Sequence, residues 1–310
     1  MPLIYFDPRF QEHQTGEHPE CPGRLQSIQT HLEKQGTLKQ WTRKEVVSVK
    51  PAQMEAIHTK NYLQELEKRA AAGGGRIEAD TVMSRKSWEV AQLAAGTAVA
   101  AVDEVIKGEQ KQAVCLIRPP GHHALSKGAM GFCLLNNVAI AAAHALNQHR
   151  LQRVLIVDWD VHHGNGTQDI FYESGRVFFF SVHRSPFYPG TGGAMETGTG
   201  EGLGTKFNLP LRFGVARKSY IEQFETVLTQ AAEKCKPELV LLSAGFDAHK
   251  ADPIGSLGLE TEDFEPLTKL VMQVAKSHCG GKLVSLLEGG YNLQALAESV
   301  EVHLNTLAAG

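Results

Sequence analysis

The stretch RVLIVDWDVHHGNG, residues 153–166, joins a continuous apolar run to two carboxylates and two imidazoles. An apolar run without alternation is typical of a parallel strand that is covered on both faces. Helical patterns at 87–108, 136–150, 219–235 and 261–278 alternate with five further short apolar runs: LIYFD (3–7), AVCLI (113–117), VFFFSV (177–182), LVLLSAG (239–245) and KLVSLLE (282–288). This alternation predicts an α/β fold with a central, mainly parallel sheet flanked by helices. Because no linker or repeat divides the chain, we expect one domain over residues 1–310.

The composition narrows the class of protein. The 310 residues carry a formal net charge of −3, which gives no basic footprint for nucleic acid. Five scattered cysteines without a C-x-x-C pair argue against both a disulfide framework and a thiolate zinc site. The N-terminus lacks the pattern of a signal peptide, and no run approaches 18 apolar residues. We therefore expect a cytoplasmic protein that binds neither nucleic acid nor membrane directly.

Unusual polar residues follow four of the predicted strands at the point where each strand ends. They stand in the segments RPPGHHA (118–124), DVHHGNG (160–166), FDAHKADP (246–253) and GGYN (289–292). The carboxyl ends of parallel strands are where an open α/β sheet builds its ligand crevice. Four coincidences of this kind predict one site assembled from all four segments.

The opening stretch offers metal ligands. In an extended chain Asp158, Asp160 and His162 share one face, but successive members stand about 6.7 Å apart, too far to hold one ion together. Asp160 and His162 can converge where the strand gives way to the loop, and Asp247 is the best-placed third ligand. Two carboxylates and one imidazole suit either Zn²⁺ or Fe²⁺, with an open position for water or substrate.

Each of these features also has a simpler interpretation. A lone D-x-D or H-H pair is usually a solvated strand end, and Tyr291 after Gly289-Gly290 could be an ordinary aromatic in a turn. Its functional interpretation is a phenol that donates to a developing oxyanion. No G-x-S-x-G motif or recognisable Cys/His signature favours covalent catalysis. We find no chemical role for His163.

Six motifs, in order, resemble those of the histone deacetylase family: RPPGHHA, GFCLLNN, DWDVHHGNGTQDIFY, SVHRSPFYPGTG, SAGFDAHKADPIG and LEGGYN. The segment HPECPGR (18–24) resembles the class II branch and its bacterial relatives. The resemblance runs from about residue 5 to about residue 295. It implies the arginase–deacetylase fold, which agrees with the strand pattern.

The resemblance also implies roles for single residues. Asp160, His162 and Asp247 would bind zinc, and His122 and His123 would be the tandem histidines that move protons during hydrolysis. A structural potassium ion would lie beside the zinc site, with Asp158, Asp160, His162, Ser181 and Val182 as its ligands.

Three further catalytic positions follow the family pattern. Asp158 would hydrogen-bond His122, and Asn165 stands where class I enzymes place a carboxylate behind His123, which is the class II choice. Tyr291 matches the tyrosine that polarises the substrate carbonyl.

The substrate-binding positions are matched less uniformly. Phe132, preceded by Gly131, and Tyr188 match the two aromatics of the acyl-lysine tunnel, although the second is usually phenylalanine. Ile254 stands where polyamine deacetylases of the family place a glutamate, which favours acyl-lysine over a cationic polyamine. Asp80 matches the rim aspartate that grips the substrate backbone, on a loose alignment, and Gly289 belongs to the same pocket.

Three functions are consistent with these residues. The first is a zinc-dependent amidohydrolase that removes acetyl or other acyl groups from lysine in a protein or peptide. The second is a deacetylase of acetylpolyamines or other small acetylated amines. The third, a binding protein without catalysis, usually lacks a ligand or the tyrosine, and none is missing here. Each of these functions is compatible with an oligomer.

Overall fold

A computed structural model describes residues 1–310 and is built around an eight-stranded sheet in which every neighbouring pair is parallel. The strand order is β2-β1-β5-β10-β9-β6-β7-β8. The strands are β1 (Leu3–Tyr5), β2 (Thr42–Lys44), β5 (Gln112–Cys115), β6 (Val154–Asp158), β7 (Val177–Arg184), β8 (Lys206–Leu211), β9 (Leu239–Ala244) and β10 (Leu283–Leu287). The prediction of an α/β fold with a central parallel sheet is confirmed.

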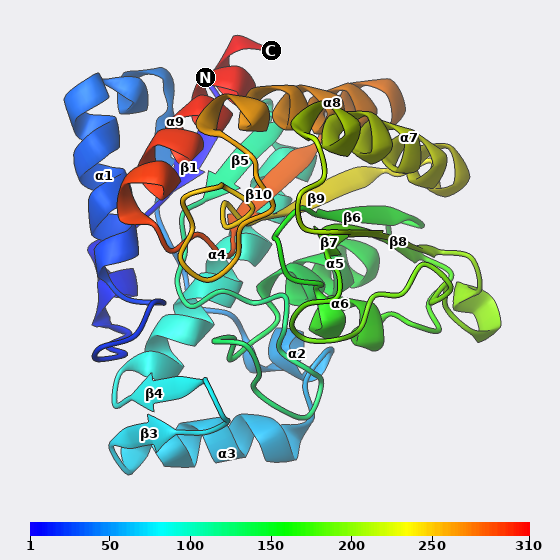
Figure 1. Ribbon diagram of the computed structural model, residues 1–310. Coiled ribbons are helices and arrows are strands. Elements are labelled where there is room, and N and C mark those ends of the chain that lie inside the picture. The colour runs from blue at the N-terminus through cyan, green and yellow to red at the C-terminus, as the bar shows by residue number, and fades with distance from the viewer.

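Helices cover both faces of this sheet (Figure 1). Helices α7 and α8 pack on β6, β7, β8 and β9 from one side, and α4 and α5 pack on β5, β6, β9 and β10 from the other. Helices α1 and α9 lie against each other near both chain ends. The helices are α1 (Gly23–Gln35), α2 (Pro51–Glu55), α3 (Lys60–Ala71), α4 (Ser87–Lys107), α5 (Asn137–Gln148), α6 (Asn165–Ile170), α7 (Arg217–Cys235), α8 (Phe264–Cys279) and α9 (Leu293–Ala309).

Short 3-10 turns and a small hairpin complete the chain. The turns are Pro8–Glu12, Thr37–Gln40, Gly200–Gly202 and Thr261–Asp263. Strands β3 (Gly74–Arg76) and β4 (Val82–Ser84) form an antiparallel pair next to α3, away from the main sheet (Figure 1). None of the helices is both long and apolar enough to cross a membrane.

The six predicted strands all form, but the two edge strands β2 and β8 were missed. All five residues of β6 are buried, which is why its apolar run is continuous. At the edges burial is incomplete: β2 (TRK) has no buried residue, and β8 (KFNLPL) is only half buried. An edge strand needs one apolar face at most, so its sequence lacks the continuous apolar run that predicts a strand. The glycine-rich segment of residues 197–205 leads directly into β8.

The register of the sheet brings the polar strand ends together. Asp158, the last residue of β6, is level with Ser181 on β7 and with Ser243 on β9. The segments that follow β5, β6, β9 and β10 therefore leave the sheet at the same edge. A core of 71 buried apolar residues on both faces of the sheet holds these strand ends in place.

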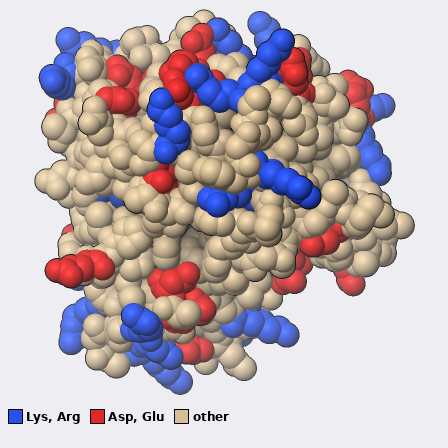
Figure 2. Space-filling view, in the orientation of Figure 1, with Lys and Arg blue, Asp and Glu red and all other residues tan.

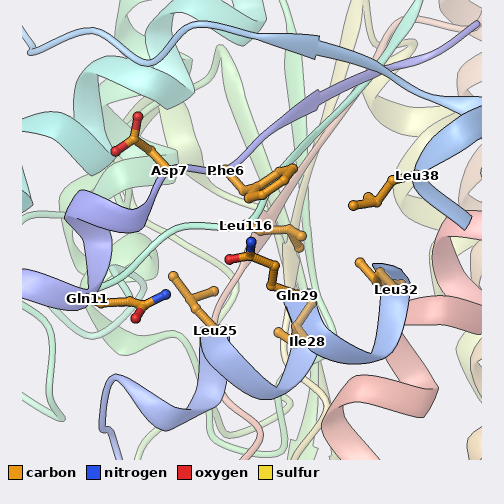
Figure 3. Close-up of a pocket in the computed structure, with 9 residues that line it drawn as sticks. All are labelled: Phe6, Asp7, Gln11, Leu25, Ile28, Gln29, Leu32, Leu38 and Leu116. Carbon is orange, nitrogen blue, oxygen red and sulfur yellow. The ribbon is translucent and has the colours of Figure 1, made fainter. Parts of the chain in front are cut away.

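A small cavity between α1 and the end of β1 lies apart from those strand ends. It is lined on one side by Leu25, Ile28 and Leu32 of α1 and on the other by Phe6 and Leu116 (Figure 3). Its volume of about 10 Å³ holds no more than a single water molecule. This cavity is a packing defect rather than a substrate site.

Candidate active site

Asp160, His162 and Asp247 meet beyond the ends of β6 and β9. Nδ1 of His162 lies 3.0 Å from Oδ1 of Asp160 and 3.1 Å from Oδ2 of Asp247. Backbone groups orient the carboxylates, since the N–H of Gly289 donates to Oδ2 of Asp160 at 2.8 Å and the N–H of Val161 donates to Oδ1 of Asp247 at 2.8 Å. The sequence-based prediction that these three side chains converge, with Asp160 and His162 already past the strand, agrees with this geometry.

The charges of this cluster call for a cation. Asp160 and Asp247 are fully buried, and their only ion-pair partners are histidines. Burial raises the pKa of Asp247 to about 7, with a further contribution from Asp160. Two carboxylates forced together out of water are costly unless a positive charge lies between them. Two carboxylate oxygens and one imidazole nitrogen can hold a divalent ion of the Zn²⁺ or Fe²⁺ type.

The tandem histidines lie beside this cluster, with ring centroids 4.0 Å apart. Nδ1 of His122 lies 2.9 Å from Oδ2 of Asp158, and Nδ1 of His123 lies 2.7 Å from Oδ1 of Asn165. Each oxygen only accepts, so both Nδ1 atoms carry hydrogen and both Nε2 atoms face away from these partners.

The two histidines differ in charge. Burial lowers the pKa of His122, but the carboxylates of Asp158, Asp160 and Glu288 outweigh burial and hold that pKa well above its usual value. Burial and the neighbouring charges of His122 and His162 hold the pKa of His123 well below its usual value, since Asn165 offers no compensating charge. Paired groups whose pKa values are pushed apart are typical of acid–base catalysis.

Three of the five predicted potassium ligands, Asp158, Ser181 and Val182, lie on the adjacent strands β6 and β7, next to the carboxylate cluster. Ser181 and Val182 are buried on β7 beside Asp158. The Ser181 hydroxyl lies 2.9 Å from Nδ1 of His183, whose Nε2 donates to the Gly192 carbonyl. His183 Nδ1 therefore accepts from Ser181, which leaves the lone pairs of the hydroxyl oxygen free for a cation.

Tyr291 lies next to Phe132, with ring centroids 5.7 Å apart. Burial raises the pKa of Tyr291 well above its usual value, although the nearby Arg24 guanidinium opposes the shift. The phenol therefore keeps its proton and remains a hydrogen-bond donor. The Arg24 guanidinium carbon lies 5.0 Å from the Tyr291 ring centroid, and its Nε donates to the Gly290 carbonyl at 2.7 Å.

Three residues that support the site were missed from the sequence: Arg24, Asp252 and Glu288. The Asp252 carboxylate accepts the N–H of Tyr291 at 2.7 Å and, through its other oxygen, the N–H of Ile254 at 2.9 Å. Glu288 is buried and accepts the N–H of Gly121 at 2.7 Å and of His122 at 3.2 Å. Glu288 could have been found from the sequence, because it is a charged residue that directly ends the apolar run KLVSLLE.

The aromatic side chains predicted to line a tunnel flank the histidines. The Tyr188 ring lies edge-on to His123 at 5.3 Å, and Phe187 stacks on His162 at 5.3 Å. Gly131 and Phe132 both have positive φ values, 54° and 71°. A Cβ on Gly131 would lie 2.3 Å from the His123 ring, so only glycine lets this loop pass so close to the histidine.

The remaining predicted residues lie around the same site. The Thr81 hydroxyl donates to Oδ1 of Asp80 at 3.1 Å and accepts the N–H of Phe132 at 3.0 Å, which connects Asp80 to the aromatic wall. Ile254 is half buried in the loop that Asp252 holds. Gly289 packs directly on the two carboxylates. Figure 2 shows charges of both signs scattered over this face without a continuous basic area.

A second cluster of three potential metal ligands, Asp103, His144 and His149, is already satisfied by hydrogen bonds. Nε2 of each histidine lies within 3.0 Å of Oδ1 of Asp103, and Lys107 pairs with the same oxygen. The Gln53 amide oxygen accepts the N–H of Lys50, so its nitrogen donates to Nδ1 of His144 and leaves the proton on Nε2. The Asp103 carboxylate therefore already has a positively charged partner, Lys107, and two hydrogen-bond donors, His144 and His149.

Comparison with known proteins agrees with this site and fold. The chain matches the Histone deacetylase domain over residues 18–307. It is 40% identical to the chloroplastic histone deacetylase 14 of Arabidopsis thaliana, over 96% of this chain and 74% of that protein. It is 39% identical to the histone deacetylase-like amidohydrolase of Pseudomonas aeruginosa, over 89% of this chain and 72% of that protein.

The solved structures show the same relationship. The crystal structure of the HDA15 HD domain superimposes with a TM-score of 0.93 at 35% identity, covering 99% of this chain and 91% of that one. The fold is thus the arginase–deacetylase fold, and the class is that of hydrolases acting on amide bonds. The chain belongs to the histone deacetylase family.

Proposed function

We propose that residues 1–310 form one catalytic domain that hydrolyses the acyl amide of lysine side chains, with a resident Zn²⁺ or Fe²⁺ ion. The observation that carries this proposal is the pair of fully buried carboxylates, Asp160 and Asp247, joined by His162 and flanked by two histidines of opposite charge preference. An amide is a poor electrophile with a poor leaving group, so its hydrolysis needs polarisation, a nucleophile and an acid in one place.

Asp160, His162 and Asp247 would hold the divalent ion. Bound there, the ion would polarise the substrate carbonyl and lower the pKa of a water molecule to about 7. A potassium ion would be held next to it by Asp158, Asp160, His162, Ser181 and Val182, and Asp158 is level with Ser181 on the neighbouring strand. The buried carboxylates of Asp158, Asp160 and Asp247 support both assignments.

The proton steps are assigned to stated atoms. Nε2 of His123 is free and neutral, so it accepts the proton of the attacking water, while Nδ1 stays bound to Asn165. His122 remains charged against Asp158 and stabilises negative charge as the tetrahedral centre forms. The protonated His123 then donates to the departing lysine amine, and the Tyr291 phenol donates to the former carbonyl oxygen.

The substrate side chain would enter between Phe132 and Tyr188, both of which lie against the catalytic groups. Asp80 at the rim would bind the backbone of a peptide substrate. Ile254 offers no charge to a cationic polyamine, so we place acyl-lysine peptides or proteins first and small acetylated amines second.

The test is a steady-state comparison of acetyl-lysine peptides, longer acyl-lysine peptides and acetylated polyamines, with and without chelator. We expect turnover of acyl-lysine peptides that is lost on metal removal and restored by Zn²⁺ or Fe²⁺. Tyr291→Phe should abolish most turnover and leave metal content intact. Activity that survives complete metal removal would refute the mechanism, and a strong preference for acetylpolyamines would make the second substrate class the correct one.

A further inference from the structure

His163 is the member of the DVHHGNG motif that the proposed reaction leaves without a role. Its side chain is buried and makes no contact with the carboxylate cluster through hydrogen bonds. It lies instead under residues 185–198, the loop that carries Phe187 and Tyr188 from β7 towards β8. The hydrogen bonds of His163 therefore concern the aromatic wall of the site.

A chain of hydrogen bonds fixes the position of the proton on His163. The Glu196 carboxylate only accepts, so the Gln168 amide nitrogen, 2.7 Å away, must donate to it. The Gln168 amide oxygen consequently faces inward, where it accepts from Asn208 at 2.6 Å and lies 3.2 Å from Nε2 of His163. Nε2 must therefore carry the hydrogen, and Nδ1 of His163 is left as an acceptor.

That acceptor holds the loop three residues after Tyr188. The Thr191 hydroxyl lies 2.7 Å from Nδ1 of His163 and is its donor. The next residue, Gly192, packs its backbone directly on two rings, since a Cβ there would lie 2.5 Å from Nε2 of His183 and 2.6 Å from Cγ of His163. The hydrogen bond of Thr191 and the close packing of Gly192 therefore fix these two residues against the body of the protein.

The segment between these anchors is held mainly by its side chains, because its backbone forms few hydrogen bonds. The backbone of residues 186–190 makes a single hydrogen bond, from Gly190 to the Phe187 carbonyl within the segment itself. On its upstream side the Arg184 guanidinium packs over the Phe187 ring at 4.1 Å. Within the segment, the Phe187 ring stacks on His162 and the Tyr188 ring lies edge-on to His123. On its downstream side the first side-chain hydrogen bond to the body is the one from Thr191 to His163, and the Gly192 carbonyl accepts from Nε2 of His183 at 2.9 Å. The bond from Thr191 to His163 therefore fixes the downstream end of the segment that places the Tyr188 ring beside His123.

The geometry points to His163 as a positioning residue that sets the Tyr188 wall of the acyl-lysine tunnel through Thr191, with Glu196 and Gln168 fixing its tautomer. This inference rests on the proposed function for its effect on substrate. His163 stays remote from the reacting atoms, so its loss would weaken substrate binding rather than the chemical step. Among substrates, long acyl chains that fill the tunnel should be affected more than acetyl.

The test compares Thr191→Val, which keeps the shape and removes the donor, with Thr191→Ser, which keeps the donor. Thr191 is exposed, so neither change disturbs the core. We expect Thr191→Val to raise KM for an acyl-lysine peptide by about 2- to 10-fold, the value of one hydrogen bond, with kcat and metal content unchanged. Thr191→Ser should restore the wild-type KM.

Hydrogen–deuterium exchange of the peptide spanning residues 185–195 provides a readout that needs no turnover. Thr191→Val should exchange faster there than wild type or Thr191→Ser, with the rest of the molecule unchanged. Equal exchange in all three proteins would refute the claim that the bond from Thr191 to His163 holds this loop. A change in kcat without a change in KM would refute the positioning role of His163. If the wild type hydrolyses no acyl amide but the exchange difference is present, the proposed function fails and the anchor stands.

Discussion

Gly289→Ala is the substitution that most directly tests whether the two buried carboxylates form a metal site. Gly289 follows β10 and faces Asp160 and Asp247. A Cβ added there would lie 2.2 Å from Oδ2 of Asp247 and 2.5 Å from Oδ2 of Asp160. Its φ is not positive, so an alanine meets no backbone strain and only the lack of space matters.

The magnitude follows from these distances. A carbon and an oxygen need a separation of about 3.2 Å, so the two carboxylate oxygens must move by about 0.7 to 1.0 Å. Metal–ligand distances hold only within about 0.2 Å of their ideal values. The shift also breaks the 2.8 Å hydrogen bond from the Gly289 N–H to Asp160. Displaced supporting groups cost about 10- to 100-fold in metal affinity, and here the ligands themselves move, so we expect a loss of at least about 100-fold.

The assay is titration of metal-free protein with Zn²⁺ in competition with a chelator of known affinity, together with thermal unfolding to confirm that the variant is folded. Gly128→Ala is the matched control, because a Cβ there meets no atom within 4 Å and φ is again not positive. The control should bind metal as the wild type does. A folded Gly289→Ala protein with wild-type Zn²⁺ affinity would show that Asp160 and Asp247 are not the ligands.

Three further predictions concern stability and support of the site. Asp252→Asn replaces a carboxylate that holds the Tyr291 and Ile254 backbones, and should lower kcat about 10-fold in steady-state assays without loss of metal. Removing the metal should lower Tm, and zinc at 100 times its Kd should restore about 2.7 kcal/mol, because binding to the folded state alone stabilises it. Burial lowers the pKa of His303 to about 3, so the unfolded chain binds the extra proton below pH 6.5 and stability falls as the pH drops from 6.5 towards 3. In denaturant titrations, the free energy of unfolding of His303→Gln should fall by about 2 kcal/mol less than that of wild type between pH 7.5 and 5. An equal fall in both proteins would show that His303 does not cause this pH dependence.

The parts of the fold that could be predicted from the sequence are those where burial is complete. Strands β6, β7, β9 and β10 are buried almost throughout, so single serines are the only polar residues inside their apolar runs. Helix α9, in which polar residues such as Gln294 and Glu298 alternate with apolar ones, follows GGYN directly and was missed because no loop separates it from that motif. Helix α1 was missed for the opposite reason, since only four of its 13 residues are buried and its pattern is weak.

The sequence by itself determined the ligand-type residues, their order, and the edge of the sheet at which they gather. Parallel strands end on a common edge, so carboxylates and imidazoles placed after strands must become neighbours. Only the tertiary structure decided how each side chain is held and charged. The opposite pKa shifts of His122 and His123 depend on Asp158 and Asn165, which reach them from another strand end. The orientation of His163 depends on Gln168, and hydrogen-bond direction is set by three-dimensional contact that no local pattern encodes.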